Sequence, residues 1–237
     1  MDNAKSKPMQ ALEEKDLLVL VEYLDLTYRW VEYFKHEALD AMVKLVDGNK
    51  SFNKWLKDFI FDDNYRLFVG KEFRFDSTSE EGQKKVPKVG SIVERSKNKS
   101  HNWTKEREAA VKFSEILHGK LTPKKYNGGL IAKYPSKVNS DNIINDVYNL
   151  YDFFATDDRY GPEVYHDIQT LGQTTDGGTK LISAMNRLYN ASKKINLEKE
   201  VIARSNINIY EVIGTWVVDH DKLEITTDGD WGANQEA

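Results

Sequence analysis

The stretch EKEVIARSNINIYEVIGTWVV (Glu198–Val218) decides how the fold of this 237-residue chain is interpreted. Its β-branched and aromatic residues predict one or two strands, joined near Ser205–Asn206. Because residues i and i+2 of a strand point to the same face, we expect Glu198 and Glu200 to present two carboxylates to one side. Like charges this close cost free energy unless a ligand or a cation compensates them. The alternative interpretation is a solvated strand end in a chain with 38 acidic residues.

The N-terminal part of the chain has helical periodicity. Between Glu14 and Gly48, apolar residues recur every three or four positions, which is typical of amphipathic helices. The pattern predicts either one long helix or two helices with a break near Lys35–His36. The next segment, SFNKWLKDFIF (51–61), predicts a shorter helix with Ser51 as its N-cap.

From Tyr65 onwards, strands and helices alternate. The segment YRLFVGKEFRF (65–75) predicts a strand with a bend or a close backbone approach at Gly70. In HNWT (101–104), a strand leads into a helix for which Thr104 is the predicted N-cap. The other predicted elements are a short strand at 91–95, a buried strand at 128–135, a helix at 140–154 capped by Ser140, a long loop at 155–178 and a helix at 178–195.

These elements indicate an α+β fold. We expect an N-terminal helical segment (1–62), a mostly antiparallel β domain (63–220) and a frayed C-terminal tail (221–237).

The composition excludes several classes of protein. A net charge of -4 argues against nucleic-acid binding driven by basicity. The chain has no cysteine, which excludes disulfides, thiolate nucleophiles and cysteine-based zinc sites, and its 5 histidines show no short metal-ligand spacing. The N-terminus lacks the apolar core of a signal peptide, and no apolar run approaches the roughly 18 residues that span a membrane. We therefore expect a cytoplasmic protein.

Three segments, in this order, resemble the sequence marks of mono-ADP-ribosyltransferases, in particular the small enzymes of T-even-type bacteriophages. NYRLFVG (64–70) is similar to the arginine-bearing strand of the family, NWTKEREAAVKFS (102–114) to its Ser/Thr strand and following helix, and EKEVIAR (198–204) to its E-x-E strand. The resemblance covers about Tyr65 to Val218. It implies a split, mostly antiparallel β core of ADP-ribosyltransferase type that encloses a cleft for NAD+.

The resemblance also implies roles for single residues. Glu200 would hold the ribose 2′-hydroxyl and stabilise the oxocarbenium-like transition state, and Glu198 would orient or deprotonate an acceptor arginine. The implied cofactor-binding residues are Arg66, Asn102, Trp103 and Thr104. NAD+ is the substrate, and the resemblance implies no metal.

Departures from the family pattern leave alternatives open at two of these positions. If Gly70 is the family's glycine, Val69 occupies the arginine's place; otherwise Arg66 is the family arginine, with Arg74 as the next candidate on the strand. Asn102 stands where serine is usual, and an amide can still donate and accept hydrogen bonds. Trp103 is equally well explained as a core tryptophan.

The implied activity is transfer of ADP-ribose to arginine side chains of host proteins, with the transcription or translation machinery as candidate targets. The protein would act in the host cytoplasm if it is phage-encoded, without contact to a membrane or direct binding of nucleic acid. The unpatterned loop at 155–178 is the predicted target-facing insertion. The alternative is a non-enzymatic interaction protein, or a degenerate transferase that binds a host protein without catalysis.

Overall fold

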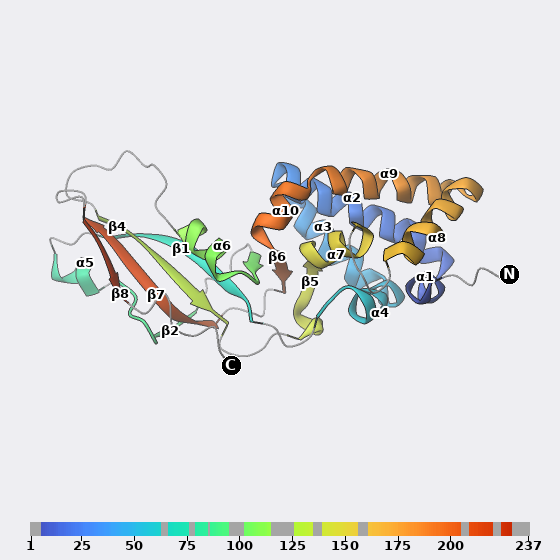
Figure 1. Ribbon diagram of the computed structural model, residues 1–237. Coiled ribbons are helices and arrows are strands. Elements are labelled where there is room, and N and C mark those ends of the chain that lie inside the picture. Colours follow the sequence, from blue (N-terminus) through green and yellow to red (C-terminus); the bar gives the residue numbers. More distant parts are fainter. Residues whose placement is uncertain are drawn as a thin grey trace. The chain divides into compact units, whose positions relative to one another are not determined.

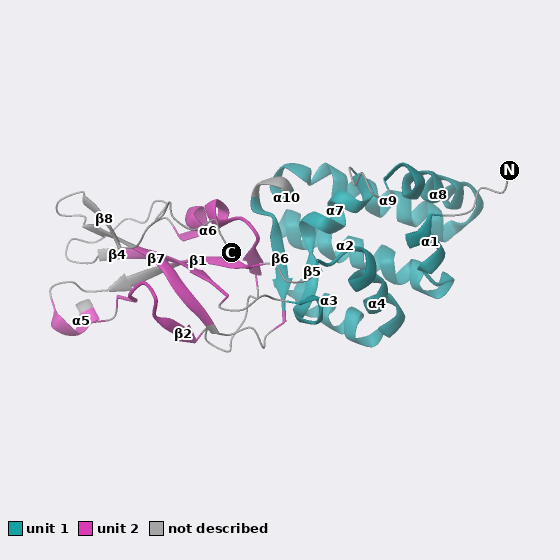
Figure 2. Ribbon diagram, turned by 60° about the horizontal axis from the view of Figure 1, so that its bottom comes forward, with its two compact units in different colours: residues 1–63, 139–203 teal, residues 64–138, 204–237 magenta. Residues whose placement is uncertain are grey.

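The chain forms two compact units in the computed structural model. A helical unit consists of residues 1–63 and 139–203, and a sheet unit consists of residues 64–138 and 204–237 (Figure 2). The residues that the structure describes are 6–62, 66–75, 79–84, 86–94, 102–114, 126–134, 139–155, 161–204, 209–219 and 224–228. The predicted α+β class is confirmed: a helical N-terminal region is followed by an antiparallel sheet (Figure 1).

The grouping of the segments differs from the predicted division into domains. One boundary between the units lies at residues 63 and 64, next to the predicted boundary. Residues 139–203, however, were expected in the β domain and instead pack with the N-terminal helices. Within the predicted tail, Glu224–Asp228 form strand β8, which pairs with β7 (Ile209–Asp219).

The helical unit combines two sets of helices with one antiparallel pair of strands. Its elements are α1 (Lys7–Ala11), α2 (Leu17–Tyr33), α3 (His36–Gly48), α4 (Lys50–Phe59), β5 (Ile143–Asp146), α7 (Val147–Ala155), α8 (Gly161–Thr174), α9 (Asp176–Asn190), α10 (Ser192–Glu198) and β6 (Glu200–Ala203). Helix α2 packs against α3 and α9, and α8 packs against α9 (Figure 1). Helices from two separate segments of the sequence, 1–63 and 139–203, therefore share one core.

Aromatic rings fill much of this core. Tyr23 and Phe52 meet edge to face with ring centroids 5.3 Å apart, and Trp55 meets Phe153 in the same way at 5.6 Å. Such a pair contributes about 1 kcal/mol beyond the burial of its surface. The buried hydroxyl of Tyr23 donates to the carbonyl of Ile144 at 2.8 Å, which ties α2 to β5.

The two-helix alternative for the N-terminal part is correct. Helix α2 ends at Tyr33, and Phe34 takes the left-handed conformation with φ 51° while its N–H donates to the carbonyl of Trp30. The expected cap at Ser51 is wrong, because α4 begins at Lys50 and Asn49 occupies the N-cap position.

Two predictions for residues 140–178 are also wrong. The expected helix at 140–154 begins only at Val147, after a short 3-10 turn (Ser140–Asn142) and strand β5. Asn139, not Ser140, caps the turn by accepting from the N–H of Asp141. Most of the expected loop at 155–178 is helix α8, and α9 begins at Asp176, after Thr175 in an extended conformation.

The sheet unit is built on long antiparallel strands. Its elements are β1 (Phe68–Phe75), α5 (Glu80–Lys84), β2 (Ile92–Glu94), β3 (Asn102–Thr104), α6 (Arg107–Ser114), β4 (Tyr126–Lys133), β7 and β8. Strand β4 lies between β1 and β7, while β3 pairs with β1, and β2 and β8 pair with β7. The buried backbone of Gly128–Ala132 confirms the predicted buried strand.

Gly70 is a point of close backbone approach, as predicted. A Cβ atom at this position would lie 1.7 Å from the carbonyl oxygen of Ala110 and 2.9 Å from the backbone nitrogen of Ser114. Helix α6 therefore rests directly on the backbone of β1, which only glycine permits. Within the part of the chain that the structure describes, no helix is long and apolar enough to cross a membrane.

Candidate functional site

Glu200 is a buried carboxyl group at the first position of β6. Its side chain is 9% exposed, and Nε1 of Trp30 donates a hydrogen bond of 2.7 Å to its Oε2. Burial raises the pKa of Glu200 to about 8, against a smaller lowering by the Trp30 hydrogen bond and a smaller raising by Glu198. The group is thus mostly protonated at neutral pH and titrates close to it.

The chain reaches this position through a sharp change of conformation. Helix α10 ends at Glu198, and Lys199 is left-handed with φ 39° before β6 begins at Glu200. The expectation that Glu198 and Glu200 share one face of a strand is therefore wrong, since Glu198 is the last residue of a helix. The two carboxyl groups are nevertheless close enough for Glu198 to raise the pKa of Glu200.

Glu198 is half-buried beside a cation. Burial raises its pKa, and the positive charge of Lys194 opposes this shift. The ammonium group of Lys194 lies 3.3 Å from the carbonyl oxygen of Glu32, 3.4 Å from Oε2 of that residue and 5.7 Å from the ring centroid of Phe34. Lys194 of α10 thus contacts the C-terminal end of α2.

Aromatic rings from the α2–α3 corner surround the donor to Glu200. The ring of Trp30 lies 5.9 Å from that of Phe34, edge to face, and 5.7 Å from that of His36. Among the non-glycine residues that the structure describes, Phe34 and Lys199 are the two with positive φ. Both flank the Trp30–Glu200 pair, and backbone strain of this kind often occurs at functional sites. We call Trp30, Phe34, Lys194, Glu198 and Glu200 the carboxyl cluster.

The carboxyl cluster has the groups needed for proton transfer and for stabilising a cation. A carboxyl group with a pKa near 8 can donate a proton below that pH and carries negative charge above it. A second carboxyl group beside it can act on a different atom of the substrate. The described part of the chain contains no group of three or more histidine, aspartate or glutamate side chains that could hold a metal ion.

The other predicted site residues belong to the sheet unit. Arg66 is half-buried and lies outside β1, which begins at Phe68. Arg74 lies on β1 opposite Asn127. The prediction that these arginines or residues 102–104 share one cleft with the glutamates stays a prediction.

The segment Asn102–Thr104 forms strand β3, which precedes α6 as expected. Thr104 is buried, and its Oγ1 accepts from the N–H of Glu106 at 2.9 Å. It stabilises the turn before α6 and is not the N-cap, because the helix begins at Arg107. Oδ1 of Asn102 is buried and has no hydrogen-bond partner among the described residues.

Trp103 lies in the core of the sheet unit. Its side chain is 2% exposed, and its ring lies edge to face with those of Tyr134 and Tyr210, each at 6.2 Å. This agrees with the alternative that the sequence left open, a core tryptophan.

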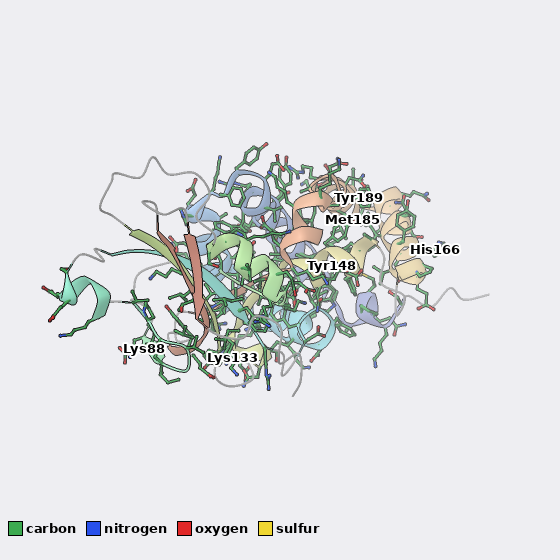
Figure 3. All side chains as sticks on the ribbon, turned by 60° about the vertical axis from the view of Figure 1, so that its left-hand side comes forward. Lys88, Lys133, Tyr148, His166, Met185 and Tyr189 are labelled. Carbon is green, nitrogen blue, oxygen red and sulfur yellow. The ribbon has the colours of Figure 1, made fainter. Side chains whose placement is uncertain are left out.

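The helical unit also has a surface pocket of about 210 Å³, whose lining does not include the two glutamates. Its lining comes from α7, α8 and α9, including Met185 and Tyr189 (Figure 3). The rings of Tyr151 and Tyr189 stack with centroids 6.1 Å apart. The pocket lining is apolar and aromatic apart from Asn186 and the hydroxyl groups of Tyr151, Tyr165 and Tyr189.

Sequence reasoning missed Trp30. A tryptophan inside an amphipathic helix is usually a core residue, and its one hydrogen-bond donor is the only sequence signal that a buried acceptor must lie nearby. Comparison of the chain with protein-family models, with curated proteins and with solved structures finds no match.

Proposed function

We propose that this protein transfers ADP-ribose from NAD+ to arginine side chains of other proteins. The observation that carries the proposal is the pair of neighbouring carboxyl groups at the α10–β6 junction, with Glu200 held by Trp30. The order of the three sequence segments supports it as well: Arg66 precedes β1, residues 102–104 form β3, and Glu200 begins β6.

Glu200 is suited to the bond-breaking step. Cleavage of the bond between nicotinamide and ribose develops positive charge on the ribose, and a neighbouring carboxylate stabilises that charge more in the transition state than in the ground state. NAD+ itself carries a cationic nicotinamide ring. Because an opposite charge favours the ionised form of an acid, bound NAD+ lowers the pKa of Glu200 from about 8 and releases its proton.

Glu198 is suited to the acceptor. A guanidinium group is a poor nucleophile while protonated, so a second carboxylate is needed to orient it or to remove its proton. The sequence resemblance further implies that Arg66 binds NAD+ phosphate or ribose oxygens and that Asn102 and Thr104 act as polar groups for the cofactor. The acceptor proteins would be host proteins if the chain is phage-encoded.

The test is cleavage of NAD+ by the purified protein. Released nicotinamide is measured with and without agmatine, a small compound that carries the guanidinium group of arginine. We expect slow hydrolysis alone, faster release with agmatine, and a melting temperature that rises with NAD+ because a ligand that binds the folded state stabilises it. Absence of both cleavage and stabilisation at millimolar NAD+ would exclude the proposal.

One observation favours a second candidate, an interaction protein without catalysis. Glu200 is buried and hydrogen-bonded to Trp30, as a purely structural carboxylic acid would be. In that case NAD+ would leave the melting temperature unchanged, and Glu200→Gln would preserve binding to the partner protein.

A further inference from the structure

We propose that Trp30, on helix α2, is a positioning residue that holds the carboxyl group of Glu200 in the orientation required for NAD+ cleavage. The inference rests on the proposed function. It also extends the machinery of that function to the N-terminal helical segment, which the sequence predicts to be separate from the catalytic domain.

The geometry of the contact supports this role. The indole of Trp30 is 3% exposed, and its N–H reaches Oε2 of Glu200 over 2.7 Å from a position 170 residues earlier in the chain. A hydrogen bond to one oxygen fixes the rotation of the carboxyl group about its last bond. It thereby assigns the other oxygen, Oε1, to the substrate.

The chemistry of the indole limits what it can do. An indole N–H only donates and neither ionises nor accepts a proton near neutral pH, so Trp30 cannot be the acid or the base. It favours the ionised form of Glu200, because a donor binds a carboxylate more strongly than a neutral acid. Trp30 therefore acts through Glu200, by orienting the carboxyl group and by easing its ionisation.

Trp30 is itself held in place. The rings of Phe34 and His36 pack on the indole, and the left-handed Phe34 donates its N–H to the carbonyl of Trp30. Two charged groups of α10 also act here: Glu198 raises the pKa of Glu200, and Lys194 lowers that of Glu198. On the strand paired with β6, the buried Asp146 lies opposite Val201. Lys199, the residue before Glu200, points its ammonium group at the ring of Tyr148, with 5.5 Å to the centroid.

The experiment compares pH profiles of kcat/KM for NAD+ cleavage. In Trp30→Phe the ring is retained and the N–H is lost, so the pKa of Glu200 rises. We expect the ascending limb of the profile to move up by about one to two pH units, since a hydrogen bond to a charged group has that strength. Activity at pH 7 then falls roughly ten- to hundredfold and recovers substantially at high pH.

A matched control is Trp55→Phe. Trp55 is also a buried indole of the helical unit, and its Nε1 donates to the carbonyl of Pro8 at 2.9 Å. This variant loses one indole hydrogen bond as well, but it should leave the pH profile in place. An equal shift in both variants, or a loss of activity in Trp30→Phe that is the same at every pH, would overturn the positioning role.

Two further measurements keep the inference separate from folding and from the proposed function. If Trp30→Phe does not fold, replacement of Trp30 by β-(3-benzothienyl)alanine keeps the shape and exchanges the N–H for sulfur. Carbon-13 NMR titration of Glu200 should show a higher pKa in either variant, and an unchanged pKa overturns the inference. Wild-type protein that does not cleave NAD+ at all would instead refute the proposed function.

Discussion

Glu198 and Glu200 differ in what surrounds each carboxyl group, and we expect this to separate their roles. Glu200→Gln should abolish both transfer to agmatine and hydrolysis by water, because both reactions need the cationic transition state stabilised. Glu198→Gln should remove transfer and spare much of the hydrolysis, because water is a less demanding acceptor. Nicotinamide release with and without agmatine measures both activities, and equal loss of both in Glu198→Gln would contradict this division.

The raised pKa of Glu200 also predicts how stability depends on pH. From about pH 4.5 to about 8, the folded protein keeps a proton on Glu200 that the unfolded chain has released. The contribution of Glu200 to stability is complete below pH 4.5 and is lost as pH rises to 8, by at most about 1.4 kcal/mol per pH unit. Glu198 acts in the same direction, because its pKa is raised too.

Chemical denaturation at pH 5, 6.5 and 8 checks this prediction. Glu200→Gln keeps an oxygen that accepts from Trp30 but cannot ionise, so its free energy of unfolding should fall less with pH than that of the wild type. Glu163→Gln, at an exposed position of α8, is the control and should follow the wild type. If the free energy of unfolding changes with pH equally in all three proteins, Glu200 is not buried as a neutral acid.

At the scale of single residues, the sequence identified the two glutamates as candidate site residues, but it did not predict how their side chains are arranged. The E-x-E spacing predicts a common strand face only if both residues lie on a strand, and Lys199 instead ends α10 in a left-handed turn. The partner of Glu200 could not be predicted, because Trp30 lies 170 positions away and periodicity carries no information on such contacts.

At the scale of elements, glycines explain both a correct and a wrong prediction. The predicted close approach of another backbone segment to Gly70 is confirmed. The expected loop at 155–178 is wrong: the segment shows no clear apolar period in the sequence, yet it forms helices, and its glycines let these helices pack closely. A Cβ on Gly178 would lie 2.2 Å from the backbone of Leu171 in α8, and one on Gly172 would lie 2.2 Å from the side chain of Ile182 in α9.

Gly70→Ala tests the contact between β1 and α6. Because the added methyl would collide with backbone atoms of Ala110 and Ser114, the helix must move off the strand. We expect a loss of about 3 kcal/mol or more in the stability of the sheet unit, at or above the usual range for overpacking. Gly48→Ala is the control: nothing lies within 4 Å of the added atom, so stability should stay equal or increase. Denaturant unfolding measures both, and a Gly70→Ala protein as stable as the wild type would contradict the contact.

At the scale of the whole molecule, the helical unit is assembled from two distant segments. Leu20 and Leu24 of α2 and Leu181 and Leu188 of α9 are almost completely buried, and α2 packs against α9. Local patterns predicted most of these helices, but not that residues 139–203 would complete the N-terminal core. Each helix shows an apolar stripe in the sequence, and a stripe does not specify which other stripe covers it.

This assembly predicts the behaviour of a fragment with residues 63–237, which retains every residue of the catalytic domain that the sequence predicts. Without α2, α3 and α4, α9 loses its contact with α2, Phe153 of α7 loses Trp55, and Tyr23 no longer binds the carbonyl of Ile144. Isolated helices of this length are marginal in water. The far-UV circular dichroism of the fragment should therefore fall by more than the removed helices account for.

The fragment should also be inactive towards NAD+, because Trp30 is absent and Glu200 loses the donor that orients it. Adding a separately produced fragment with residues 1–63 should restore helicity and activity together if the core reassembles from its two segments. A fragment that keeps the full helicity of α7 to α10, unfolds cooperatively and cleaves NAD+ would show that the N-terminal helices are an independent appendage. Such a result would contradict both the shared core and the role of Trp30. Loss of helicity with retained cleavage would contradict only the role of Trp30.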